Sequence, residues 1–239
     1  HVGTSGGAAC PASTLTDVRE GLGVDVVDLY GSRETGGICR DGVVYPQVKI
    51  HIVPIDGDDP GDGTTKRGEI CVCTPRQTLG YYGDDGRTQA AFVLVEGEKY
   101  YKTGDVGELS IDKDGKRHLK ILERCAFMFK LAQGEWVSPS RVEAAIEDSP
   151  YVSQSVVVPD ATNTAVIAVI VPTSGRAETG HDLRPKLMEE VRFWSAHHNL
   201  RPIEVPRDVV VAEEAWTEAN GMLTGNGKKN RRSLAARFA

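Results

Sequence analysis

The stretch V-D-L-Y-G-S-R-E-T-G-G, residues 27–37, decides how the first half of this chain folds. An apolar, β-prone run ends at Tyr30 and a glycine, and a small polar residue, a cation, a carboxylate and two glycines follow. This order predicts a strand that enters a turn. The turn would present an aromatic face, backbone N–H groups, a guanidinium and a carboxylate close together. Such parts suit a nucleotide, with the aromatic for the base, the donors and cation for phosphate, and the carboxylate for a metal.

Composition excludes several classes of function. The 239 residues carry a formal net charge of -6, with 40% hydrophobic and 26% charged residues, as in ordinary globular proteins. No dense Lys/Arg face is evident, which argues against nucleic-acid binding, and the one concentrated basic run is residues 228–232. No apolar run reaches the roughly 18 residues of a membrane span.

The cysteines favour a reducing compartment. Their number is five, which is odd, and no Cys-x-x-Cys or Cys/His ligand pattern occurs. A cytoplasmic location is therefore expected. No targeting signal is recognised, and because the sequence begins with His rather than Met, we expect a fragment whose true start is not seen.

The first half of the chain predicts a small, mostly antiparallel sheet. A helix is expected over 13–22, with strands at 24–30, 44–53 and 68–73. Residues 101–111 and 116–122 predict a hairpin around a tight turn at 112–115.

The second half has a different character. Ser138, a proline, and Ser140 three residues before Glu143 predict a helix start with a capping box. Strands are expected at 155–159, 165–171 and 208–211, an amphipathic helix at 181–198, and a basic helix after a loop that begins at residue 220. A compact α/β unit therefore follows a β-rich unit, with the boundary near residues 123–126.

Four segments together resemble one superfamily. They are YGSRE (30–34), YKTGD (101–105), LER with FKLAQGE (122–124 and 129–135), and LTGNGK (223–228). In order and spacing they are similar to the motifs of acyl-CoA synthetases, peptide-synthetase adenylation domains and luciferases, over nearly the whole chain. Residues 129–135, 148–150, 205–208 and 219–224 resemble, within that superfamily, carboxylic acid reductase adenylation domains and long-chain acyl-CoA synthetases.

The resemblance implies the architecture. The fold would be mixed α/β, with residues 1–124 as the C-terminal part of the large adenylation domain and residues 125–239 as the small lid domain. The superfamily's Thr/Ser/Gly-rich phosphate loop would lie upstream of Gly6. We therefore expect this portion alone to lack a complete site and to need the N-terminal part of the domain as a partner.

The resemblance also implies a nucleotide site. Tyr30 would stack on adenine, Asp105 would accept hydrogen bonds from ribose hydroxyls, and Arg124 would reach ribose or phosphate oxygens. Glu34 would hold Mg²⁺ between ATP phosphates. The remaining expected nucleotide contacts are Gly7, Ala8, Gly31, Ser32 and Arg33. The competing interpretations are a tyrosine packed on the sheet, ordinary turn acids and a surface ion pair.

The catalytic residue implied by the resemblance is Lys228, which would place a cation where negative charge develops during adenylation. Lys229 is rejected because the family's lysine directly follows glycine. Lys130 and Gly134 would face the thiol in the second half-reaction, although an exposed strand lysine is an equal interpretation of Lys130. Ala126 takes the hinge position about which the lid would rotate between the half-reactions.

The implied activity is ATP-dependent conversion of a small carboxylic acid to an acyl-adenylate, followed by transfer to the thiol of CoA or of a carrier domain's phosphopantetheine. The alternative is a non-catalytic remnant or split half that docks a carrier protein or another partner. A nucleotide-binding regulator is a third reading, which leaves the Lys228 segment unexplained. Gly36, Gly37 and Ile38 are the few candidates for acyl-pocket walls, and they do not identify the acid.

Two positions depart from the superfamily's pattern. Arg33 stands where threonine is usual, and a guanidinium holds phosphate more strongly but cannot act as a small hydroxyl beside a metal. Ala126 replaces the charged or polar residue usual at the hinge. The Arg33 departure bears on how the ATP site works, and the Ala126 departure bears on the rotation of the lid.

Overall fold

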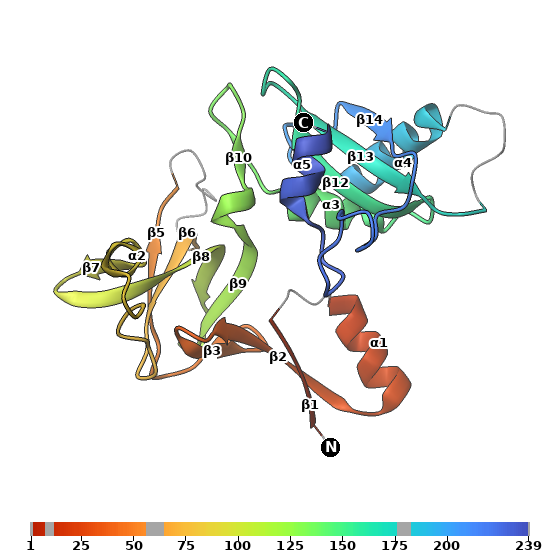
Figure 1. The fold of residues 1–239 in the computed structure, drawn as a ribbon. Helices are drawn as coiled ribbons and strands as arrows, with labels where there is room; N and C mark the ends of the chain where they lie inside the picture. The colour runs from red at the N-terminus through yellow and green to blue at the C-terminus, as the bar shows by residue number, and fades with distance from the viewer. Residues whose placement is uncertain (1, 8–11, 56–64, 176–182, 239) are drawn as a thin grey trace. The chain divides into compact units, whose positions relative to one another are not determined.

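The computed structural model describes residues 2–7, 12–55, 65–175 and 183–238. The chain divides into two compact units, His1–Cys125 and Ala126–Ala239, each with its own hydrophobic core (Figure 1). A mixed α/β fold is confirmed, and each unit is described by itself below.

The first unit is built on one sheet. Its described strands are β1 (Val2–Gly6), β2 (Asp25–Ser32), β3 (Gly36–Arg40), β4 (Val43–Val44), β5 (Lys49–Val53), β6 (Lys66–Cys73), β7 (Phe92–Val95), β8 (Glu98–Ile111) and β9 (Arg117–Arg124). Its described helices are α1 (Ala12–Leu22) and α2 (Asp85–Ala90). The strand order is β1-β2-β3-β4-β9-β8-β6-β5, with β7 on β8. β1 runs parallel to β2, and the other described neighbours are antiparallel.

Most predicted elements of this unit are confirmed, including the β8–β9 hairpin, but one expectation is wrong. The strand expected over 44–53 is two strands, because Pro46 has no N–H for a ladder and Val48 N–H instead bonds Tyr45 O at 3.0 Å. Helix α2 and strand β7 were not predicted.

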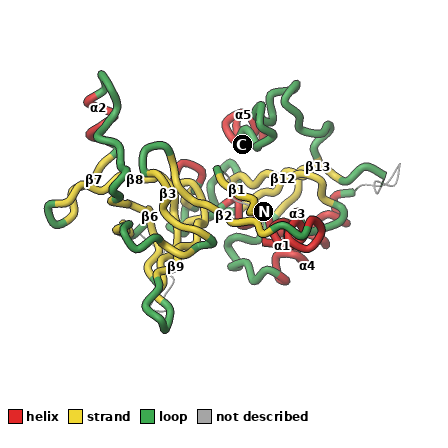
Figure 2. Tube along the Cα trace, turned by 90° about the horizontal axis from the view of Figure 1, so that it is seen from below, coloured by secondary structure: helices red, strands yellow, loops and turns green. Residues whose placement is uncertain are grey.

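The second unit is a sheet covered on both faces. Its elements are β10 (Phe129–Lys130), β11 (Trp136–Val137), α3 (Pro139–Glu147), β12 (Val152–Pro159), β13 (Val166–Pro172), α4 (Arg184–His197), β14 (Asp208–Val211) and α5 (Arg231–Phe238), after a short 3₁₀ turn, η1 (Cys125–Phe127). Strands β12 and β13 are antiparallel, and β14 adds parallel to β13. Figure 2 shows α3 and α4 on one side of this sheet and α5 on the other.

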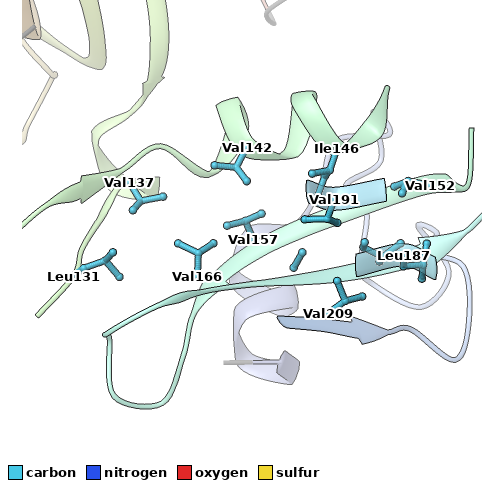
Figure 3. Packing of buried hydrophobic residues seen from close by; sticks show 12 residues of the cluster. Leu131, Val137, Val142, Ile146, Val152, Val157, Val166, Leu187, Val191 and Val209 are labelled. Atoms are coloured by element: carbon cyan, nitrogen blue, oxygen red, sulfur yellow. The ribbon is translucent and has the colours of Figure 1, made fainter. Parts of the chain in front are cut away.

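Side chains of β12 and β13 pack against helices on both faces of the sheet, since successive side chains of a strand point to opposite faces. Val157 packs on one face with residues of α3 and α4 (Figure 3), and Ile170 belongs to the same cluster. Val156 and Val169 pack on the other face with Leu234 of α5. The near-continuous apolar runs of these strands follow from burial on both sides.

The predicted capping box at the start of α3 is wrong. Ser138 occupies the N-cap position, but its side chain makes no capping hydrogen bond. The Glu143 carboxylate instead accepts a hydrogen bond from Val157 N–H at 3.0 Å and pairs with basic side chains. Two cations and a buried N–H are stronger partners for a carboxylate than a single amide at a helix end.

Candidate active site

Three predicted nucleotide residues of the first unit meet at one point. The Tyr30 hydroxyl, on β2, donates to Asp105 Oδ2 on β8 at 2.7 Å. Arg124, the last residue of β9, lies opposite Asp105 in the β8–β9 ladder and places Nε 2.9 Å from Asp105 Oδ1. Strand pairing therefore gathers side chains that are 75 and 19 positions apart in the sequence.

Burial sets the electrostatics of this cluster. Desolvation raises the pKa of Asp105, while the hydrogen bond from Tyr30 and the charge of Arg124 act in the opposite direction. Desolvation, and next the charge of Asp105, raise the pKa of Tyr30, so its hydroxyl stays a donor. Each Asp105 oxygen accepts one of these contacts, and a carboxylate oxygen has a further lone pair for an incoming hydroxyl.

The Thr-Gly-Asp turn holds Asp105 in place. Thr103 Oγ1 accepts from Asp105 N–H at 3.1 Å and donates to Ile70 O at 2.8 Å. Gly104 has φ +70, a left-handed conformation that residues with a Cβ rarely adopt. The glycine is therefore a requirement of the backbone path that presents the carboxylate.

The turn after β2 is pinned from within. Ser32 N–H donates to Thr35 Oγ1 at 3.1 Å, and the buried Thr74 hydroxyl donates to Thr35 O at 2.6 Å. A Cβ on Gly31 would lie 2.2 Å from the Gly36 carbonyl oxygen, so only glycine fits there. Arg33, by contrast, is exposed at the tip of the turn.

Glu34 is held by Tyr81, whose hydroxyl also contacts a second tyrosine. The Tyr81 hydroxyl donates to Glu34 Oε1 at 3.2 Å and lies 3.1 Å from the Tyr101 hydroxyl. The Arg87 guanidinium lies 3.8 Å from the centre of the Tyr81 ring. Partial desolvation raises the pKa of Glu34, but hydrogen bonds from backbone N–H, Ser32 and Tyr81 outweigh it and hold the pKa below the ordinary value.

Glu34 fits the role of a single metal ligand. Among the described residues there is no group of three or more His, Cys, Asp or Glu side chains arranged to hold a metal ion. Mg²⁺ in nucleotide sites is commonly held by one or two carboxylates together with substrate phosphates, and the ionised Glu34 meets that requirement.

The other predicted residues of the first unit are partly placed. Gly6 pairs with Leu29, so Gly7, with φ +80, follows β1 beside the strand that carries Tyr30. Ala8 lies outside the described residues. Gly37 lines a cavity of about 390 Å³ together with Tyr45, whereas Ile38 is 1% exposed in the core and is not a cavity wall.

Lys228 lies in the second unit, at the end of a tight loop of residues 224–228. Thr224 N–H donates to Lys228 O at 2.7 Å, Gly227 N–H donates to Thr224 O at 2.8 Å, and Leu223 and Lys229 form a bridge at the base. Gly227 has φ +75, which favours glycine at this turn. The loop is exposed, so Lys228 stands on an exposed hairpin-like turn.

Lys130 and Gly134 belong to the small β10–β11 hairpin. Lys130 pairs with Trp136 in the ladder and places Nζ 5.7 Å from the centre of the indole ring. Gly134, with φ +97, closes the turn by donating to Leu131 O at 2.8 Å. Ala126, the predicted hinge, is an exposed residue of η1 and the first residue of the second unit.

Comparison with known proteins shows what the chain is similar to. Residues 141–222 match the family model of the AMP-binding enzyme C-terminal domain. Over nearly its whole length the chain is similar to adenylate-forming enzymes, a class of AMP-forming ligases.

Within that class its relatives include carboxylic acid reductases and acyl-CoA synthetases. It is 32% identical over 237 residues to a carboxylic acid reductase of Mycobacterium tuberculosis, covering 95% of this chain and 20% of that protein. It is 27% identical over 263 residues to fatty acyl-CoA synthetase B of Dictyostelium discoideum, covering 98% of this chain and 38% of that protein.

Solved structures of the Segniliparus rugosus carboxylic acid reductase are also similar. Its A domain in complex with AMP and a co-purified carboxylic acid matches with a TM-score of 0.82 at 29% identity, covering 99% of this chain and 37% of that chain. Its A-PCP didomain in complex with AMP matches with the same TM-score and identity, covering 98% of this chain and 33% of that one. The chain thus spans about a fifth of the curated reductases and about a third of these solved chains.

Sequence reasoning missed the residues that hold the candidates in place. They are Thr35, Tyr81 and Thr103 in the first unit and Glu143, Lys229, Arg201 and Glu204 in the second. Most of them also have a partner distant in sequence, for which spacing carries no signal. Local turn chemistry could have suggested Thr103, inside the Thr-Gly-Asp motif, and Thr35, which bonds Ser32 three positions earlier.

Proposed function

We propose that this chain is the C-terminal portion of an adenylation domain: the end of the large domain up to residue 124, and the lid domain from residue 125. Together with the preceding portion it activates a small carboxylic acid with ATP and passes the acyl group to a thiol. The observation that carries the proposal is the buried Asp105 carboxylate held by Tyr30 and Arg124, in the same chain as a lysine on an exposed, hydrogen-bonded turn.

The chemistry has two steps. The acid's carboxylate oxygen attacks the α-phosphorus of ATP, the bond to the pyrophosphate oxygen breaks, and an acyl-adenylate forms. A thiolate then attacks the acyl carbonyl, and AMP leaves with the electrons of the carbonyl–oxygen bond. Splitting the transfer in this way replaces a poor leaving group with a good one.

The residues have separate roles in these steps. Asp105 and Arg124 bind ribose, with Arg124 also within reach of phosphate, and the Tyr30 ring contacts adenine while Gly7, Ala8, Gly31, Ser32 and Arg33 complete the nucleotide contacts. Glu34 would hold Mg²⁺, which neutralises phosphate charge when bound. Lys228 stabilises charge in the first step, and Lys130 and Gly134 face the thiol in the second, with Ala126 as the hinge.

The acceptor thiol belongs to CoA or to a carrier domain's phosphopantetheine. The A-PCP didomain of the Segniliparus rugosus enzyme favours a carrier, and the acyl-CoA synthetase relatives favour CoA. A cytoplasmic location suits both acceptors. Among the described residues, no helix is long and apolar enough to cross a membrane, and the described cysteines Cys39, Cys71, Cys73 and Cys125 are free thiols.

A non-catalytic docking module is the second candidate, favoured by Arg33. Its exposed guanidinium stands at the position where threonine is usual in the superfamily, next to the proposed metal ligand. A module of this kind would bind a carrier domain without turning over ATP. Activity of the Arg33 protein and of an Arg33→Thr variant separates the two candidates.

The test uses a joined protein, in which this chain follows the preceding part of the Segniliparus rugosus A domain. Lys228→Ala should abolish acid-dependent ATP–pyrophosphate exchange yet keep transfer from a supplied acyl-adenylate to a thiol. Lys113→Ala, in the exposed turn of the β8–β9 hairpin, is the matched control and should keep both. Exchange that survives Lys228→Ala would refute the catalytic role.

A further inference from the structure

A buried carboxylate lies behind the Lys228 loop (residues 224–228). Glu143 of α3 is 2% exposed and receives Lys229 Nζ at 2.8 Å and the two Arg231 nitrogens Nη1 and Nη2 at 2.7 and 2.8 Å. Lys229 Nζ also bonds Glu147 Oε1 at 2.8 Å. We call Glu143, Glu147, Lys229 and Arg231 the Glu143 network.

This network clamps the loop at its base. Lys229 directly follows Lys228 and forms the backbone bridge to Leu223 that closes the loop. The charge of Lys229, and then Arg231, hold the pKa of Glu143 below its ordinary value against strong desolvation, so the clamp is ionic. Since charge-assisted contacts in a buried site are strong and directional, the position of residue 228 is set from α3.

A second buried carboxylate lies behind the β10–β11 hairpin (residues 129–137). Glu204, also 2% exposed in its side chain, accepts from Arg201 Nη2 at 3.1 Å and from Arg141 Nη1 at 3.2 Å. Arg201 Nη2 also donates to Trp136 O at 2.6 Å, and Nη1 lies 3.6 Å from Glu135 Oε2. We call Glu204, Arg141 and Arg201 the Glu204 network.

We propose that these two networks are separate positioning devices for the two half-reactions: the Glu143 network sets the Lys228 loop for adenylation, and the Glu204 network sets the hairpin for thiol transfer. The networks are built from different side chains, and each reaches one loop through the cation that touches it, Lys229 or Arg201. The kinetic part of this inference rests on the proposed function; the positional part does not.

Hydrogen exchange on this chain tests the positional part. Lys229→Met and Arg201→Met remove the clamping charges but leave the buried carboxylates and much of each side chain's apolar stem. Lys229→Met should speed amide exchange in residues 223–229 about tenfold and leave residues 129–137 unchanged. Arg201→Met should speed amide exchange in residues 129–137 about tenfold and leave residues 223–229 unchanged. Arg237→Met, which breaks an exposed ion pair with Glu214 on the same unit, should change neither.

The joined protein tests the kinetic part. Lys229→Met should slow acid-dependent ATP–pyrophosphate exchange at least tenfold, with transfer from a supplied acyl-adenylate within twofold of wild type, because small misplacement of a catalytic group is costly. Arg201→Met should slow transfer from a supplied acyl-adenylate at least tenfold and leave ATP–pyrophosphate exchange within twofold of wild type. Lys229→Arg keeps the charge and should recover exchange activity.

The outcomes separate the two claims. Equal effects of both variants on both loops, or no effect on the nearby loop, would overturn the positioning roles whatever the activity. If wild-type joined protein is folded but shows no exchange, the proposed function fails, while the loop-specific amide exchange still decides the positional part.

Discussion

Replacing Tyr30 with phenylalanine isolates one contact of the candidate nucleotide site. The change deletes the hydroxyl that donates to Asp105 Oδ2 at 2.7 Å and leaves the ring. Asp105 has a side chain only 10% exposed, so water does not readily replace the lost donor. A hydrogen bond to a charged group is worth about 1.5–3 kcal/mol, and we expect a loss of about 2 kcal/mol at pH 7.

The loss should depend on pH. Burial raises the folded-state pKa of Asp105 above its unfolded value, so ionising it costs stability as pH rises from the unfolded through the folded pKa. Losing the Tyr30 donor raises the folded pKa further and enlarges that cost. Below about pH 4, where the unfolded carboxyl is also protonated, only a neutral hydrogen bond is lost, worth about 1 kcal/mol.

The assay must report the first unit by itself. The three tryptophans, Trp136, Trp194 and Trp216, all lie in the second unit, so intrinsic fluorescence does not follow this change. Amide exchange in residues 98–124, corrected for the intrinsic pH effect, should accelerate about 30-fold at pH 7 and about fivefold near pH 4. Tyr82→Phe, a fully exposed tyrosine, should change neither value. Unchanged protection, or a loss equal at both pH values, would refute the reasoning.

Two further predictions follow from the packing and from Glu34. Ile146→Ala removes a fully buried side chain of α3 and should lower the free energy of unfolding of the second unit by about 3 kcal/mol. Tryptophan fluorescence in urea measures this change. A loss below about 1 kcal/mol would contradict the packing shown in Figure 3. Tyr81→Phe removes a donor to Glu34, so the pKa of Glu34 should rise towards its ordinary value in a carbon-13 NMR titration, and a pKa that stays where it was would contradict the contact.

The sequence predicted elements whose signal is local. The β8–β9 hairpin, strands β12 to β14 and helix α4 follow from alternation, turn residues and helical spacing. Pro46 lacks the N–H that a ladder needs, which indicates the break between β4 and β5, but the alternation on either side of it favours one continuous strand. The unpredicted α2 is six residues long, too short for periodicity to reveal.

Contacts across the fold explain what sequence reasoning could not supply. Tyr30 and Asp105 were expected in one nucleotide site from the resemblance, but their direct hydrogen bond depends on the register of strands far apart in the chain. Glu143 was assigned to a capping box, since its partners Lys229 and Arg231 lie more than 80 positions away. Local patterns carry no information about such partners.

Acid-dependent ATP–pyrophosphate exchange, with fatty, aryl and amino acids, tests the central claim most directly. The chain alone, shown to be folded, should give no exchange, and the joined protein should give exchange with one class of acid. Exchange by the chain alone would contradict its assignment as one portion of the domain. A folded joined protein that exchanges with none of the acids would contradict its role in adenylation.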